Sequence, residues 1–215
     1  MKRPLDAYNG VAEEEVWSDQ KYGEGKQPFQ KELNMENRKK IRNWSIAGAV
    51  FTLAVGTLLH FVYDWFPGTV TAVFGAVNES TWEHLKLIFW PVVMFGIVEF
   101  FAYGKKIRGF LPIKVASLLL GMLTITALFY TYTGVLGFHL APVDISTFVI
   151  GTAAAYFFAC RMLKEPRPWA ESSLALFAAL AVFFLFLVFF GSFSFHTPHL
   201  GIFQDPVTGG YGLGE

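Results

Sequence analysis

The stretch SLALFAALAVFFLFLVFFGSFSF, residues 173–195, contains no charged side chain and is long enough to cross a bilayer. A helix needs about 20 apolar residues to span a hydrocarbon layer of about 30 Å. Four further stretches meet or approach this requirement, at about 44–66, 84–104, 113–136 and 144–161, and residues rich in Gly and Pro separate them. The sequence therefore predicts an all-α polytopic membrane protein with a five-helix transmembrane domain over 44–195.

The overall composition also indicates a membrane protein. Of the 215 residues, 53% are hydrophobic and only 16% are charged, whereas soluble domains carry about a quarter charged residues. The formal net charge of zero provides no basic face, so nucleic-acid binding is not expected. A single cysteine, Cys160, excludes a disulfide framework within the chain and a cysteine-rich metal site.

Two tails flank the predicted membrane domain. Residues 1–43 carry mixed charges without a long apolar run, and we expect a polar cytoplasmic tail. No apolar stretch follows at once on a short basic start, so the first hydrophobic segment is predicted to remain as an uncleaved anchor. Residues 196–215 are too apolar to extend freely into water. We expect them to fold over the outer mouth of the bundle and to bring His196 or His199 toward Glu83 and His84.

The distribution of lysine and arginine predicts the orientation of the bundle. The basic residues near helix ends on one side are Arg38, Lys39, Lys40, Arg42, Lys105, Lys106, Arg108, Lys114, Arg161, Lys164 and Arg167. The segments 67–83, 137–143 and 196–215 on the other side contain none. Cytoplasmic loops retain basic residues, so we expect the N-terminus inside and the C-terminus outside, in the inner or plasma membrane.

The histidines are all predicted on the outer side of the membrane. They are His60, His84, His139, His196 and His199, and the acids Asp64, Glu79, Glu83 and Asp205 accompany them. Ionisable groups at membrane depth are costly and tend to mark functional sites. For His139, His196, His199 and Asp205, a simple position in the aqueous interface is the more economical interpretation.

His60 ends a stripe of residues spaced by four: Gly48, Thr52, Gly56, His60 and Asp64. Small residues at this period allow another helix to approach closely, so this face is expected to pack inward. Asp64, one turn from His60, is then placed to orient the imidazole, either as a structural pair or beside a metal.

The densest group of polar side chains is the segment NESTWEHLK, residues 78–86. If it forms the first turns of a helix, Glu79 and Glu83 share one face and Lys86 extends that face. The structural alternative is that Asn78 caps the helix and that Glu79 is favoured there by the helix dipole.

Imidazoles and carboxylates in this number are ligand types of zinc, manganese and iron. We predict that His60, Glu83 and His84 bind a divalent transition metal such as zinc, and that Glu79 is the catalytic general base for a metal-bound water. The side chains expected to support or line this site are Asp64, Asn78, Lys86, Tyr130, Tyr132, His196 and His199.

Four strings carry a resemblance to a known family: HFVYDW at 60–65, VNESTWEHLK at 77–86, YTYTG at 130–134 and DPVTGGYG at 205–212. Together they resemble a family of small bacterial multi-pass integral membrane proteins of unknown function, over about residues 44–212. The resemblance implies several membrane helices and treats these residues as a unit, and it implies no activity.

Two other interpretations of the outer cluster stay open. One is a non-enzymatic protein, either a carrier or an accessory subunit, in which the cluster binds a solute or a partner. Five helices are few for a carrier, so that protein would form a homo-oligomer or a larger complex in the lipid bilayer. The other is haem held between His60 and a second outer histidine. Glu99, inside a predicted span, is expected to pair with Lys105 or Lys106 near the inner end.

Overall fold

The computed structural model describes residues 7–213, with side chains from residue 35 onward. Its described residues form helices and no β-strand, and five helices are long and apolar enough to cross a membrane, which confirms the predicted fold class. The helices are α1 (Ala7–Trp65, with its apolar part at Met35–Trp65), α3 (Thr81–Ala102), α4 (Phe110–Leu136), α5 (Ala141–Leu163) and α7 (Ser173–Ser192). The outermost residues of the two predicted tails, 1–6 and 214–215, lie outside the described part.

The chain divides into two units between Ile41 and Arg42. The described part of the first unit is the N-terminal portion of α1. The second unit holds the helical bundle and the short connecting helices. These are α2 (Thr69–Phe74), α6 (Pro168–Glu171) and the 3-10 helices η1 (Gly104–Lys106) and η2 (Gly201–Phe203).

The spans α3, α4 and α5 each begin three residues earlier than predicted, and local structure at the helix start explains this for α3 and α5. Ser80 caps α3 by accepting a hydrogen bond from the backbone N–H of Glu83, so the helix begins at Thr81 rather than near 84. Pro142 lies in the first turn of α5, where its missing N–H is not needed, so this span covers 141–163 rather than 144–161. With 23 residues, α5 is therefore long enough to span a bilayer.

The stripe on α1 packs inward as predicted from Gly48 to Gly56, whereas its last member, Asp64, is exposed. A Cβ atom built on Gly48 would lie 2.8 Å from the ring of Phe95 in α3, and one built on Gly56 would lie 2.6 Å from Phe148 in α5. Thr52 between them is buried, and its hydroxyl shares a 3.0 Å hydrogen bond with that of Tyr156. Close backbone approach and one polar contact thus attach α1 to the bundle.

Replacing a glycine of this stripe should cost more stability than replacing a glycine with free space around it. Gly56→Ala should destabilise the protein by about 1–3 kcal/mol, because the new methyl group would overlap Leu87 O and the Phe148 ring. Gly134→Ala in α4 meets no atom within 4 Å and should be neutral or stabilise by up to about 1 kcal/mol, through helix propensity alone. Unfolding by SDS in mixed micelles, followed by circular dichroism, compares the two. Equal stability of the two variants would contradict the packing of α1.

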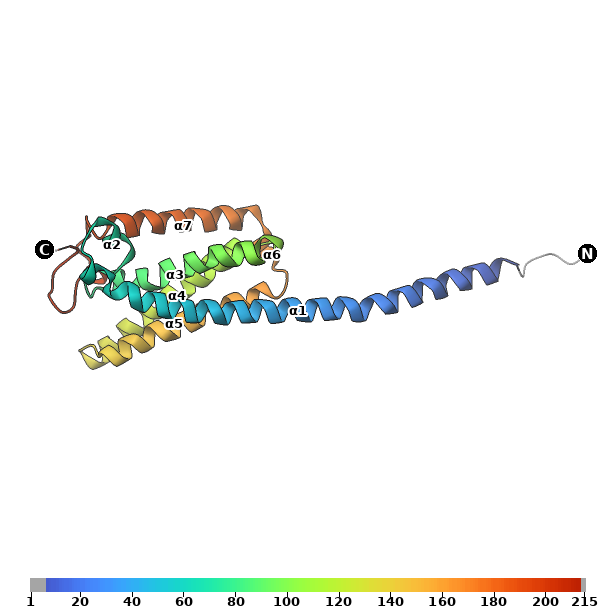
Figure 1. The fold of residues 1–215 in the computed structure, drawn as a ribbon, viewed down its shortest axis with the longest axis horizontal. Helices are drawn as coiled ribbons and strands as arrows, with labels where there is room; N and C mark the ends of the chain where they lie inside the picture. Colours follow the sequence, from blue (N-terminus) through green and yellow to red (C-terminus); the bar gives the residue numbers. More distant parts are fainter. Residues whose placement is uncertain (1–6, 214–215) are drawn as a thin grey trace, which may run out of the picture. The chain divides into compact units, whose positions relative to one another are not determined.

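Aromatic rings fix α7 and the C-terminal tail to α3. Trp82 in the first turn of α3 contacts Phe190 of α7 at a ring-centroid distance of 4.7 Å and Phe203 of the tail at 4.9 Å. Phe190 is fully buried, whereas Phe184 on the same helix is exposed, so α7 presents rings both to the bundle and outward. α2 and the tail consequently lie at the same end of the bundle (Figure 1).

A buried ion pair joins α3 to α4 near the opposite end. The Nζ atom of Lys114 lies 2.6 Å from Oε2 of Glu99, and the hydroxyl of Tyr103 donates to Oε1 at 2.7 Å. The predicted partners of Glu99, Lys105 and Lys106, are exposed instead. The expected pairing was therefore wrong in its partner, because the first turn of α4 brings Lys114 against α3 while the η1 turn directs its lysines outward.

Candidate metal centre

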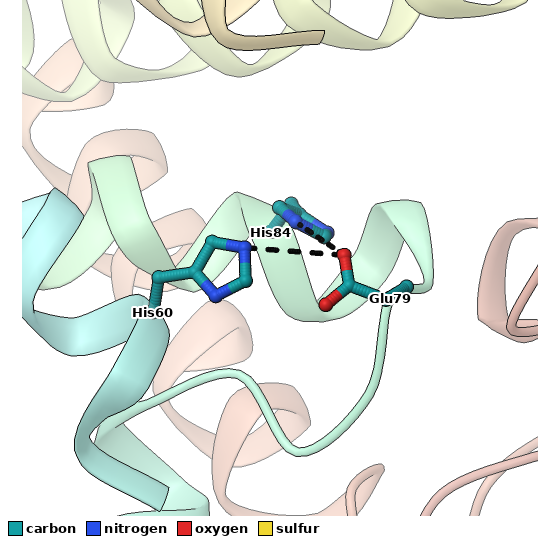
Figure 2. A group of neighbouring side chains, drawn as sticks. All are labelled: His60, Glu79 and His84. Carbon is teal, nitrogen blue, oxygen red and sulfur yellow. Dashed lines mark ion pairs between the residues drawn. The ribbon is translucent and has the colours of Figure 1, made fainter. Parts of the chain in front are cut away.

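Three side chains from separate segments converge at the end of the bundle where α2 and the tail lie. His60 comes from the last turns of α1, Glu79 from the residues just before α3, and His84 from its first turn. Oε2 of Glu79 lies 3.4 Å from Nε2 of His84 and 3.9 Å from Nε2 of His60. Figure 2 shows both imidazoles turned toward this carboxylate. One ligand atom from each residue lies within 4.8 Å of the other two.

These separations suit a small cation. A tetrahedral zinc ion with bonds of about 2.0–2.1 Å holds its ligand atoms about 3.3–3.4 Å apart. The His84–Glu79 separation of 3.4 Å already matches this spacing. The His60–Glu79 separation of 3.9 Å, within a group that spans up to 4.8 Å, requires the His60 side chain to move closer. The carboxylate is about half exposed, so a metal in solution can reach it. The group can therefore supply three ligands to one ion.

The backbone fixes the tautomer of His84. Its Nδ1 atom lies 2.9 Å from the carbonyl oxygen of Ser80, which can only accept a hydrogen bond, so Nδ1 carries the proton in the neutral ring. Nε2 then presents a lone pair toward Glu79. A lone pair facing a carboxylate is repulsive unless a proton or a metal ion lies between them. A hydrogen-bonded imidazole of this kind is the usual form of a metal-binding histidine.

His60 lacks such support. Its Nδ1 atom is buried and has no hydrogen-bond partner. Asp64, which we expected to orient this ring, is exposed and does not fill that role. His60 stacks on Phe61 instead, at a centroid distance of 4.9 Å, and meets His84 edge-on at 5.1 Å. His84 is accordingly the better-oriented ligand of the two.

Glu83, the third ligand expected from the sequence, belongs to a different cluster. It is 2% exposed, and its Oε2 atom lies 2.5 Å from Nζ of Lys86 and accepts a 3.1 Å hydrogen bond from the backbone N–H of Val77. Its Oε1 atom accepts from Ser194 Oγ at 2.8 Å. Glu79, predicted as the general base, takes the position among the histidines. Because α3 begins at Thr81, Glu79 precedes the helix and does not share a helical face with Glu83.

Lys86, expected to support the site, completes this second cluster. Its ammonium group is fully buried and donates to the carbonyl oxygens of Ala72 and Gly75 at 2.7 and 3.3 Å, and to Ser194 Oγ at 2.5 Å. These contacts join α2, α3 and the end of α7 around one paired charge. Lys86 and Ser194 are both fully buried, and the Ser194 hydroxyl also donates to Glu83, so these contacts hold the three segments together.

The tail holds the segment that carries Glu79. Asn78 does not cap the helix, which was the structural alternative for this segment. Its Oδ1 accepts from Ser80 N at 2.9 Å, and its Nδ2 donates to Gly212 O at 3.0 Å. Asp205 accepts from Val207 N at 2.7 Å and also from the backbone N–H of Glu79. Burial alone would raise the pKa of Asp205, but these hydrogen bonds and those from Thr208 hold it below the usual value. Asp205 therefore remains a carboxylate and anchors Glu79.

A cavity of about 290 Å³ opens beside the three ligands. Its polar lining includes the group His60, Glu79 and His84, and also His139 and Asp144 from the start of α5 and the loop before it. Nδ1 of His139 lies 3.3 Å from Oδ2 of Asp144, and the hydroxyl of Tyr132 donates to Oδ1 of the same carboxylate. Asp144 was not among the predicted site residues. It lies only five residues after His139, at the predicted start of the next helix, and this short spacing could have indicated the pair.

The remaining predicted site residues lie outside the three-ligand group. Tyr132 belongs to the His139–Asp144 pair, and Tyr130 donates to the tail carbonyl of Gly201 at 3.4 Å. His199 stacks on Tyr211 at 4.5 Å, and His196 is exposed. The tail therefore reaches the site through Asp205, Pro206 and Gly212 rather than through its histidines.

Comparison with known proteins places the chain in a family without a known activity. A family model described as a family of unknown function (DUF6512) matches residues 33–213. No curated protein and no solved structure matches the chain. The matched region includes the complete bundle, the ligand group and the tail residues that hold it.

Proposed function

Since the chain belongs to this family of unknown function, we propose an activity from the geometry of the site: a membrane-bound enzyme that holds a divalent transition metal, zinc first, between His60, Glu79 and His84. One observation carries the proposal. Three ligand atoms from three segments converge at the wall of a cavity, within 4.8 Å of one another. Catalytic zinc sites use three protein ligands and leave the fourth position to water or substrate, and two histidines with one glutamate are a known set.

The chemistry that follows is hydrolysis. A zinc ion in such a site lowers the pKa of a bound water to about 7 and polarises a carbonyl oxygen. The cavity would bring a substrate to the open position of the metal. Within the described residues, His139 is the further imidazole that lines this cavity, and Asp144 orients it through Nδ1, which leaves Nε2 free to handle a proton.

The topology is part of the proposal. The basic residues cluster at the ends of α3, α4 and α5 that lie away from the site, and the positive-inside rule places these ends in the cytoplasm. The metal centre would then face the outer side of the inner or plasma membrane. The C-terminal tail would cover it from outside.

A carrier is less favoured than an enzyme. A transport path would need polar groups along the bundle, and Glu99 is an acid that lies within a span. In the structure Glu99 is paired with Lys114 and does not line the cavity. Haem is also disfavoured. Two histidines that ligate haem iron approach it from opposite faces of the porphyrin, whereas the Nε2 atoms of His60 and His84 both face the Glu79 carboxylate.

Metal analysis of the purified full-length protein tests the proposal. We expect close to one zinc per folded chain, and loss of the metal in His84→Ala. This variant should melt at the temperature of the metal-free wild type, because the ring is partly exposed and the stability that bound zinc adds is absent from both. His60→Ala should weaken binding less, because its Nδ1 lacks the orienting partner that His84 has.

His196→Ala is the matched control, since it removes an exposed imidazole at the same end of the bundle without touching the ligand group. It should keep its metal. A wild-type protein that remains metal-free after incubation with zinc, or equal losses in the His84 and His196 variants, would overturn the proposal.

A further inference from the structure

We infer that the cavity beside the metal centre takes the head group and first part of the chain of an uncharged single-chain lipid with an ester carbonyl, such as a monoacylglycerol, entering sideways between α1 and α5. The evidence for the binding site is the cavity itself and does not depend on a bound metal. The reaction at the carbonyl rests on the proposed function.

The walls of the cavity suit an acyl chain. Apart from the polar groups described above, most of the side chains that line it are apolar: Phe61, Leu87, Ile125, Phe129, Ala141, Ile145, Phe148 and Pro206. They come from α1, α3, α4, α5 and the tail. A ligand with one polar end therefore finds hydrogen-bonding and metal-binding groups on one part of the lining and hydrocarbon contacts on the rest.

The cavity opens toward the position of the lipid. Phe61 on α1 and Ile145 on α5 both line it, and they are 43% and 65% exposed. Exposed apolar side chains on membrane-spanning helices face the hydrocarbon layer. A ligand can thus pass between these two helices without crossing water.

The size limits what the cavity encloses. Its volume of about 290 Å³ is at the lower end of the range for ligand pockets, about 300–1,000 Å³. On α5 the lining runs from Ala141 to Phe148, which is about 10 Å of helix at 1.5 Å per residue. A head group and the first methylene groups fill this length, and the rest of the chain would extend through the opening into the bilayer.

The charges in the lining favour an uncharged head group. Among the described residues, the cavity has the carboxylates of Glu79 and Asp144 and no lysine or arginine. A divalent metal would offset Glu79 and leave roughly one positive charge opposite the Asp144 carboxylate. Free hydroxyl groups of a glycerol head can donate to Asp144, and the ester carbonyl would lie close enough to the metal to be polarised by it. A phosphate head would instead face the Asp144 carboxylate.

The reaction that fits this placement is ester hydrolysis. With the metal bound, the oxygen of an activated water would attack the ester carbonyl carbon, and the bond from that carbon to the glycerol oxygen would break. One proton of the water passes to the departing glycerol oxygen. The products are a fatty acid and glycerol, and no oxidant or reductant is needed.

Photolabelling tests the lipid site. The full-length protein in lipid nanodiscs is irradiated with a monoacylglycerol that carries a diazirine in its acyl chain, and the labelled residues are mapped by mass spectrometry. We expect labels concentrated on the lining residues Phe61, Ile145 and Phe148. Thr57→Phe should reduce them several-fold, because Thr57 lines the cavity and its hydroxyl bonds only within its own helix, to Leu53 O.

Leu58→Phe is the matched control, since Leu58 is the next residue, is exposed and does not line the cavity. It should leave the labelling unchanged. Unlabelled monoacylglycerol should compete, and a phosphate-headed lipid of the same chain should compete at least several-fold less well. Labels spread evenly over outward residues such as Leu174 and Phe184, equal effects of the two variants, or stronger competition by the phosphate lipid would overturn the inference.

The lipid site and the metal centre can be contradicted independently of each other. Localised labelling in a protein that binds no zinc would keep the lipid site and remove the hydrolysis. Zinc bound through His84 with evenly spread labels would keep the metal centre and remove this substrate class.

Discussion

Replacing Lys86 with methionine should destabilise the protein by about 3–5 kcal/mol, because the buried Glu83 carboxylate would lose its cation. Both side chains are within 2% of complete burial, so water cannot replace the lost partner. The ammonium group also satisfies the carbonyl oxygens of Ala72 and Gly75, which would be left without this donor. SDS unfolding in mixed micelles measures the change.

A double-variant cycle separates the ion pair from simple packing. Lys86→Met combined with Glu83→Gln removes both charges, and it should be more stable than Lys86→Met alone by more than 1 kcal/mol. Lys106→Met is the matched control, since Lys106 is exposed and its loss should change stability by less than about 0.5 kcal/mol. A double variant no more stable than Lys86→Met would show that the pair is not the source of the effect.

Glu99→Gln is expected to have an effect of the same size, about 3–5 kcal/mol, at the other end of the bundle. The amide is close in shape to the carboxylate and can still accept from Tyr103, so the main loss is the negative charge opposite Lys114. Lys114 would keep a contact with the ring of Tyr156, 4.7 Å from its centroid, which is weaker than a buried ion pair. The same unfolding assay applies.

The Tyr103 hydroxyl should stay protonated throughout the neutral range. Burial is the larger cause and the Glu99 carboxylate the second, and both raise the pKa of Tyr103 above its usual value.

Glu99→Gln with Lys114→Met should recover part of the stability lost in the single variant. If Glu99→Gln unfolds at the wild-type SDS concentration, the pair contributes no stability. Both ion-pair variants should retain one zinc per chain that remains folded, since neither pair belongs to the ligand group.

The sequence was sufficient to predict the five helices because the apolar runs are long and are separated by Gly and Pro. It also singled out His60, Glu79 and His84 among a larger set. It could not separate the roles of Glu79 and Glu83, because that depends on where α3 begins. The string Ser80-Thr81-Trp82-Glu83 has the spacing of a capping box, and this pattern could have shown that Glu83 turns back toward the helix start.

Contacts between residues far apart in the sequence were harder to predict. Lys114 rather than Lys105 pairs with Glu99 because of how α3 and α4 pack, and hydropathy contains no information on that rotation. The link from Asp205 to the Glu79 backbone joins two residues that are far apart in the sequence and meet at one end of the bundle, so only the folded chain reveals it.

This link has a consequence for how the protein is made. Membrane helices are inserted in the order of synthesis, and Asn78 and Glu79 emerge long before the residues that hold them. Asn78 is 134 residues from its partner Gly212. The ligand group can therefore reach its final geometry only after the last membrane helix has been inserted and the tail has been released on the same side. Metal loading would be a late event in biogenesis, and a chain truncated before Asp205 would reach the membrane with its helices in place and its centre incomplete.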